Sequence, residues 1–105
     1  LTIGGAIQLY EKAIEINPGF FYPYQDLAVI YARQGNFLKA SDNIEKLKLI
    51  IPNNPRVYYN SALVNLALKD KNKALADVQR GLELVRLDPE TGKLLQELAN
   101  QLQKQ

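Results

Sequence analysis

The sequence contains no histidine, no cysteine, no methionine and no tryptophan. Without histidine and cysteine, disulfides, thiolate nucleophiles, the usual zinc ligands and the one side chain that titrates near neutral pH are excluded. We therefore expect no catalytic site, no metal site and no cofactor, and the chain is predicted not to be an enzyme. Because no methionine is present, we do not expect Leu1 to be a natural start, and the chain is interpreted as a processed product or a segment of a longer protein.

Excess charge and long apolar runs are also missing. The formal net charge is only +2, so no electrostatic footprint points to nucleic acid. No apolar run approaches the roughly 20 residues that span a bilayer, and no basic-then-apolar leader opens the chain. We expect a soluble piece without direct membrane contact. The cytoplasm is the expected compartment, and the periplasm or a membrane-tethered parent are the alternatives.

What the sequence does contain is a repeat of 34 residues. The same residue class returns at this interval in several series: Ala6, Ala40 and Ala74; Pro18 and Pro52; Tyr24 and Tyr58; Ala28 and Ala62; Tyr10, Ile44 and Val78. Agreement at so many positions indicates a repeat architecture.

Apolar residues at helical spacing, interrupted by proline, glycine and asparagine, predict six helices. We expect them at residues 4–16, 22–34, 37–50, 55–68 and 71–86, with a sixth opened by Asp88 and Pro89. Pro89 comes three residues after the position where the repeat would place a proline, so the fifth helix is predicted to run about a turn longer than the third. The sixth helix places Leu94, Leu95, Leu98 and Leu102 on one side and polar residues on the rest, as a capping helix should.

The stretch from Tyr24 to Pro52 resembles the tetratricopeptide repeat, whose 34-residue unit carries an aromatic residue, x2-Leu-Gly-x2-Tyr, Ala-x3-Phe and Pro. The resemblance implies an all-α fold, an α-solenoid of helical hairpins. We expect one domain over residues 1–105: the second half of a truncated repeat (1–20), two repeats (21–54 and 55–88) and the capping helix (89–105). The structural repeat positions are Ala6, Tyr10, Ala13, Pro18, Tyr24, Leu27, Ala28, Tyr31, Ala40, Ile44, Pro52, Tyr58, Ala62, Ala74 and Val78.

The second full repeat departs from the family pattern. Ser61 replaces the leucine and Asn65 replaces the tyrosine, so this seam is predicted to be less apolar than its counterpart. We expect the Ser61 hydroxyl to bond back to the preceding turn.

In this family the first helix of each hairpin lines the concave groove. The resemblance therefore implies that the stripe of residues opposite the core positions of each first helix binds a partner. The candidate residues are Tyr22, Gln25, Asp26, Val29 and Arg33 in one helix and Arg56, Tyr59, Asn60 and Leu63 in the other. Tyrosines offer flat contact area, amides can bond a peptide backbone, and the arginines can hold a carboxylate. A solvated helix face with no ligand is the alternative.

The predicted function is a scaffold that binds a partner peptide or protein segment on its concave face. Self-association is an alternative, since the half-repeat at the start, with Ile3 and Ile7, would leave an apolar side open for a second copy. Another alternative is that the chain is the C-terminal repeat array of a larger, membrane-anchored or soluble, enzyme or assembly factor.

Overall fold

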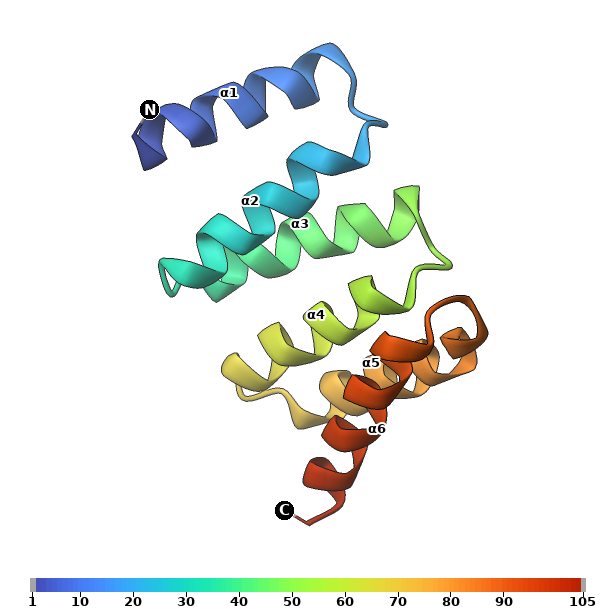
Figure 1. The fold of residues 1–105 in the computed structure, drawn as a ribbon. Coiled ribbons are helices and arrows are strands. Elements are labelled where there is room, and N and C mark those ends of the chain that lie inside the picture. The colour runs from blue at the N-terminus through green and yellow to red at the C-terminus, as the bar shows by residue number, and fades with distance from the viewer. Residues whose placement is uncertain (1, 105) are drawn as a thin grey trace. The chain divides into compact units, whose positions relative to one another are not determined.

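The computed structural model describes residues 2–104, and within them every element is helical (Figure 1). The chain divides into two compact units, Leu1–Pro52 and Asn53–Gln105. The expected single domain over 1–105 begins and ends at Leu1 and Gln105, which lie outside the described residues, and it stays a prediction.

The first unit holds α1 (Ile3–Ile16), α2 (Phe21–Arg33) and α3 (Phe37–Ile50). The second holds α4 (Pro55–Ala67), α5 (Lys71–Glu83), the short 3-10 helix η1 (Val85–Leu87) and α6 (Pro89–Gln103). Within each unit, α2 packs against α3 and α4 against α5 as hairpins (Figure 1). The predicted six α-helices and their order along the chain are confirmed for the described residues.

The 34-residue period extends to the helix starts. The helices that form the second half of each repeat unit, α1, α3 and α5, begin at residues 3, 37 and 71, each directly after an N-cap residue. The capping side chains of Thr2, Asn36 and Asp70 each accept a hydrogen bond from the N–H three residues on. The first helices α2, α4 and α6 begin at residues 21, 55 and 89, so α6 stands in the frame of a first helix.

The turn inside each hairpin is a Schellman motif. In the first, the N–H of Gly35 donates to the Ala32 carbonyl and that of Asn36 to the Tyr31 carbonyl. In the second, the N–H of Lys69 donates to the Leu66 carbonyl and that of Asp70 to the Asn65 carbonyl. The residue after the left-handed position therefore closes one helix with its backbone and caps the next with its side chain, which explains how two helices join through so short a turn.

Small residues form the packing seams. Ala40, Ala62 and Ala74 are 0% exposed, and the larger side chains of Tyr24, Leu27 and Ile44 in the first unit are also buried. The Tyr24 hydroxyl donates to the Pro18 carbonyl over 2.7 Å, which ties α2 to the loop that precedes it. The remaining repeat positions are buried at Ala28, Tyr58 and Val78, half-buried at Ala6, Tyr10, Ala13 and Tyr31, and exposed at Pro18 and Pro52.

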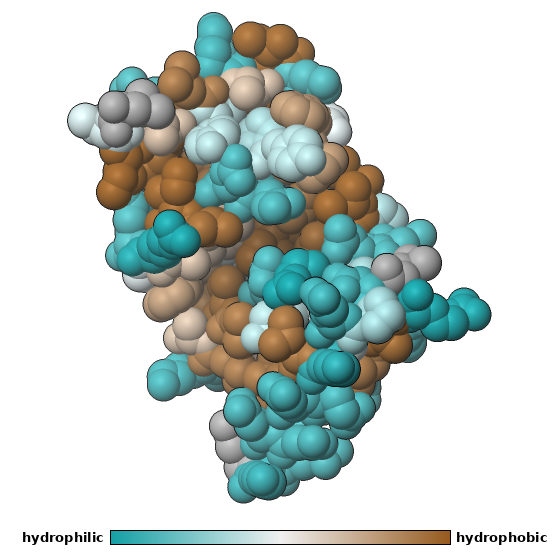
Figure 2. All heavy atoms as spheres, viewed as in Figure 1, coloured by the Kyte–Doolittle hydropathy of each residue, from teal (hydrophilic) through white to brown (hydrophobic). Residues whose placement is uncertain are grey.

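In the second unit α6 closes the core. Leu95, Leu98 and Leu102 join Ala62, Ala74 and Val78 in one buried cluster. Gly81 allows this approach, since a Cβ there would lie 2.7 Å from a Leu95 methyl. Hydrophilic residues cover the C-terminal end of α6, at the bottom of the view in Figure 2. The outer face of the last helix is polar, as the sequence predicted for a cap.

The predicted length of the fifth helix is wrong. α5 has 13 residues and α3 has 14, and η1 follows α5 after Leu84. Pro89 lies 34 residues after Pro55 and occupies the same first helical position. It is therefore the counterpart of Pro55 and not a counterpart of Pro52 displaced by three residues. Because a residue before proline avoids the α region, Asp88 is non-helical, with φ −157° and ψ 86°, and the chain must leave the α-helix before it.

α1 differs from the other second helices in its burial. It contains no buried residue, and Ala6 is half-buried where Ala40 and Ala74 are fully buried. Ile3 is 59% exposed, and hydrophobic residues reach the surface around α1 at the top of the view in Figure 2. Among residues 2–104, no helix has both the length and the apolar character needed to cross a membrane.

Candidate functional site

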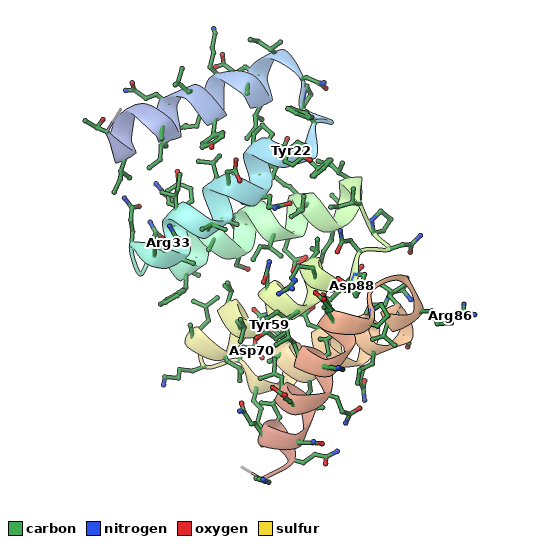
Figure 3. All side chains as sticks on the ribbon, viewed as in Figure 1. Tyr22, Arg33, Tyr59, Asp70, Arg86 and Asp88 are labelled. Atoms are coloured by element: carbon green, nitrogen blue, oxygen red, sulfur yellow. The ribbon has the colours of Figure 1, made fainter. Side chains whose placement is uncertain are left out.

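The α2 stripe consists of Tyr22, Gln25, Asp26, Val29 and Arg33. The structure places these residues on one helix, with Tyr22 and Arg33 toward its opposite ends (Figure 3). All are exposed except Asp26, which is half-buried. Val29, an apolar residue, is 41% exposed near the middle of the stripe.

Asp26 contacts the neighbouring helix rather than only solvent. A hydrogen bond with the Asp26 carboxylate, together with its negative charge, raises the pKa of the Tyr10 hydroxyl on α1 above its usual value. Tyr10 donates its proton to this bond, and ionisation of Tyr10 would place two negative charges side by side. Part of the Asp26 binding capacity is therefore used inside the first unit.

Tyr22 belongs to a group of three aromatic residues at the start of α2. Its ring centroid lies 4.1 Å from that of Phe21 and 5.5 Å from that of Phe20. Phe20 is 43% exposed and Tyr22 is 52% exposed. The ring contacts hold Tyr22 in place while one side remains open to a ligand.

The α4 stripe consists of Arg56, Tyr59, Asn60 and Leu63. Arg56 and Leu63 are exposed, whereas Tyr59 and Asn60 are half-buried. The Arg56 guanidinium carbon lies 5.7 Å from the centroid of the Tyr59 ring, within the range of a cation–π contact. This contact holds the guanidinium over the Tyr59 ring.

Tyr59 also has a structural role. Its ring packs against the buried cluster that contains Leu95, Leu98 and Leu102 of α6. The sequence indicated free aromatic area at this position, but Tyr59 is half-buried against this cluster, which leaves only part of the ring for a partner. Arg56 and Leu63 are the more accessible members of the α4 stripe.

The sequence predicted only one member of a buried polar pair that joins α4 and α5. The seam at Ser61 and Asn65 is polar and buried, as the sequence predicted, and the Asn65 side-chain amide donates to an Asp77 carboxylate oxygen over 2.8 Å. Asp77 was not predicted. The available signal was its position three residues after Ala74, on the inward stripe of α5. The predicted back-bond of the Ser61 hydroxyl stays a prediction.

The two stripes share their frame in the repeat. Position 29 on α2 is equivalent to position 63 on α4, and the apolar residues there, Val29 and Leu63, are 41% and 42% exposed. Tyr22 and Arg56 are likewise equivalent and exposed. The stripes offer apolar contact area, amides and guanidinium groups, which suits non-covalent binding of a peptide.

Comparison with known proteins agrees with the repeat. Models described as tetratricopeptide repeat match residues 9–40 and 55–90. The chain is 25% identical over 101 residues to the E3 ubiquitin-protein ligase CHIP of Arabidopsis thaliana, covering 96% of this chain and 36% of that protein. It is 35% identical over 80 residues to the protein O-mannosyl-transferase TMTC3 of Homo sapiens, covering 75% of this chain and 9% of that protein.

Among solved structures, the crystal structure of MamA is similar, with a TM-score of 0.76 at 20% sequence identity. The match covers 97% of this chain and 61% of that one. It confirms the fold class, an all-α solenoid of tetratricopeptide-type hairpins. The chain spans 36% and 9% of the two curated relatives, so their ligase and transferase names describe much longer proteins.

Proposed function

We propose that this chain, which belongs to the tetratricopeptide repeat family and is a protein interaction module of that type, holds a partner segment on the α2 and α4 stripes. One observation carries the proposal. Val29 and Leu63 occupy the same repeat position and leave 41% and 42% of their surface in water. Other apolar side chains of the same helices are buried, Tyr24 and Leu27 on α2 and Val57, Tyr58 and Val64 on α4.

The chemistry of the stripes indicates an extended peptide. Val29 and Leu63 would contact apolar side chains of the partner, and Gln25 and Asn60 would bond its backbone. Arg33 and Arg56 would hold acidic side chains or a terminal carboxylate. Asp26, which already contacts Tyr10 of α1, and Tyr59, which packs against the buried cluster of the second unit, would contribute less.

The test begins with a random peptide library selected against the full chain. Enriched peptides are then titrated calorimetrically into the unaltered protein and into the Leu63→Glu and Val29→Glu variants. We expect each variant to bind at least tenfold more weakly, which corresponds to about 1.4 kcal/mol. Leu49→Glu is the matched control, since Leu49 is an 84% exposed leucine of α3 outside both stripes. Equal affinity for all four proteins would remove the stripes from consideration.

We propose self-association as a second candidate function, supported by the surface of α1. Ile3 is 59% exposed, and Ala6 lacks the complete burial of Ala40 and Ala74. A second copy packed on this side would bury apolar surface that now faces water.

Sedimentation across a range of concentrations decides this second candidate. We expect the average mass to rise with concentration and Ile3→Glu to abolish the rise. A monomer mass at all concentrations would reject self-association and leave the stripe proposal intact.

We propose as a third reading that the chain is a repeat array within a larger protein. Its similarity to minor parts of two proteins with enzyme names supports this interpretation. The coding sequence that surrounds this segment tests it directly, because an adjoining catalytic domain is expected and its absence would contradict the reading.

A further inference from the structure

The second unit contains a pocket that is lined by no residue of either stripe. It has a volume of about 380 Å³ and lies where α5, η1 and α6 meet. Leu82, Val85 and Pro89 supply its apolar surface, and Arg86, Lys93 and Gln96 supply its polar groups.

A glycine shapes this pocket. A Cβ on Gly92 would lie 3.1 Å from Val85 Cβ and Cγ1, so α6 approaches η1 more closely than a larger residue would allow. The start of α6 is also fixed, because the Thr91 N–H and hydroxyl both donate to the Asp88 carboxylate. Thr91 itself is fully buried. The walls are therefore held by the fold and do not depend on a ligand.

The charges around the pocket are positive. Its lining includes Arg86 and Lys93 and no carboxylate. Within residues 2–104, neither cation has an ion-pair partner. Figure 3 shows the Arg86 side chain reaching outward from η1, away from the helices, where it can meet an incoming ligand.

Four carboxylates lie near these cations in the sequence, and one of them, Asp88, accepts two hydrogen bonds from Thr91. Glu83 is bonded to Arg80 over 2.9 Å. Glu90 and Glu97 are exposed residues of α6, three positions before and four after Lys93, and neither lines the pocket. The apolar surface thus remains bordered by two uncompensated cations.

We propose that this pocket docks a short acidic peptide segment, which inserts one apolar side chain against Leu82, Val85 and Pro89 and places a neighbouring carboxylate near Arg86 and Lys93. A cavity of roughly 150 Å³ accommodates a benzene-sized group, so 380 Å³ has room for one large side chain and adjoining backbone. The pocket is open to solvent on one side, whereas small-molecule sites enclose most of their ligand. A peptide that inserts a single side chain fits this shape better.

The test uses the probe peptide acetyl-Asp-Phe-Glu-Leu-amide and its uncharged counterpart acetyl-Asn-Phe-Gln-Leu-amide. Each is titrated into the isotopically labelled full chain and followed by amide chemical shifts. We expect the acidic probe to shift the amides of Leu82, Val85, Gly92 and Gln96 and to bind about tenfold more tightly than the uncharged one. Exchange of the two cations, Arg86→Glu with Lys93→Glu, should remove this preference.

The matched control is Lys46→Glu with Lys104→Glu, which changes the net charge equally at exposed lysines outside the pocket. We expect it to bind the acidic probe within about twofold of the unaltered protein. Equal binding of both probes, shifts that map to other residues, or no shift at millimolar concentration would each overturn the proposal. Decanoate binding at these amides without peptide binding would reassign the pocket to small amphiphiles. Because no stripe residue lines the pocket, these outcomes leave the stripe proposal unaffected.

Discussion

At the scale of single residues, Gly35 and Lys69 occupy the same left-handed turn position 34 residues apart. Their φ angles are 78° and 64°. Only glycine adopts this conformation without a steric penalty, which is roughly 1–2 kcal/mol for other residues. Lys69 is therefore a strained position in the second hairpin.

The Lys69→Gly variant is expected to stabilise the protein by about 0.5–1 kcal/mol, because relief of strain exceeds the added entropy of the unfolded chain. Urea denaturation measures the difference. Gly35→Ala is the opposing variant and should lower the free energy of unfolding by about 1 kcal/mol. A loss of stability in Lys69→Gly would contradict the assigned turn geometry.

Asn65 and Asp77 form the second residue-scale feature. Both are buried, and removal of one partner leaves a polar group without its hydrogen bond. We expect Asp77→Ala to lower the free energy of unfolding by about 1–3 kcal/mol. A double-mutant cycle with Asn65→Ala should give a coupling energy of at least about 0.5 kcal/mol. Additive effects would show that the bond does not stabilise the hairpin.

At the scale of elements, helix starts could be predicted to within a residue or two because their signals are local. Asn54 with Pro55, and Asp88 with Pro89, combine a capping side chain with a first-position proline. The end of α5 could not be predicted in the same way. It depends on where α6 must begin, which became clear only from the alignment of Pro89 with Pro55.

The α2 and α4 stripes likewise could be predicted only in part. Helical spacing was enough to place Val29 and Leu63 on exposed faces. Asp26 contacts Tyr10 of α1, and Tyr59 packs against a buried cluster that includes residues of α5 and α6. No spacing within one helix contains that information. The same reason explains why Asp77 was missed.

The cap of α6 makes the stability of this helix dependent on pH. Hydrogen bonds from Thr91 hold the pKa of the Asp88 carboxyl below its usual value, and the positive charge of Arg56 acts in the same direction. A folded-state pKa below the unfolded one gives stability that is present above about pH 4 and is lost as the pH falls further.

We therefore expect the difference in melting temperature between the unaltered protein and Asp88→Asn to shrink as the pH is lowered from about 6 to about 2.5. Asparagine keeps a capping oxygen but cannot titrate, so it isolates the charge. Circular dichroism melts at several pH values measure the effect. A difference that stays constant over this range would rule out Asp88 as the titrating group.

At the scale of the whole molecule, burial predicts unequal local stability among three helices that share one repeat frame. α3 and α5 each contain buried residues, and α1 contains none. Amide exchange through local opening follows such differences. In dilute protein, amides of α1 are expected to exchange at least tenfold faster than those of α3 or α5, a difference of about 1.4 kcal/mol. Equal protection of all three helices, by native-state hydrogen exchange, would show that burial does not set local stability here.

We propose that the exposed stripes of the first helices bind the partner. Photo-crosslinking tests it most directly, with benzoylphenylalanine substituted in turn for Val29, Leu63, Leu38 and Leu49, all of which are exposed apolar positions. A biotinylated peptide from the library selection serves as the partner. We expect crosslinks from positions 29 and 63 and none above background from positions 38 and 49 on α3. Crosslinks confined to positions 38 and 49 would contradict it.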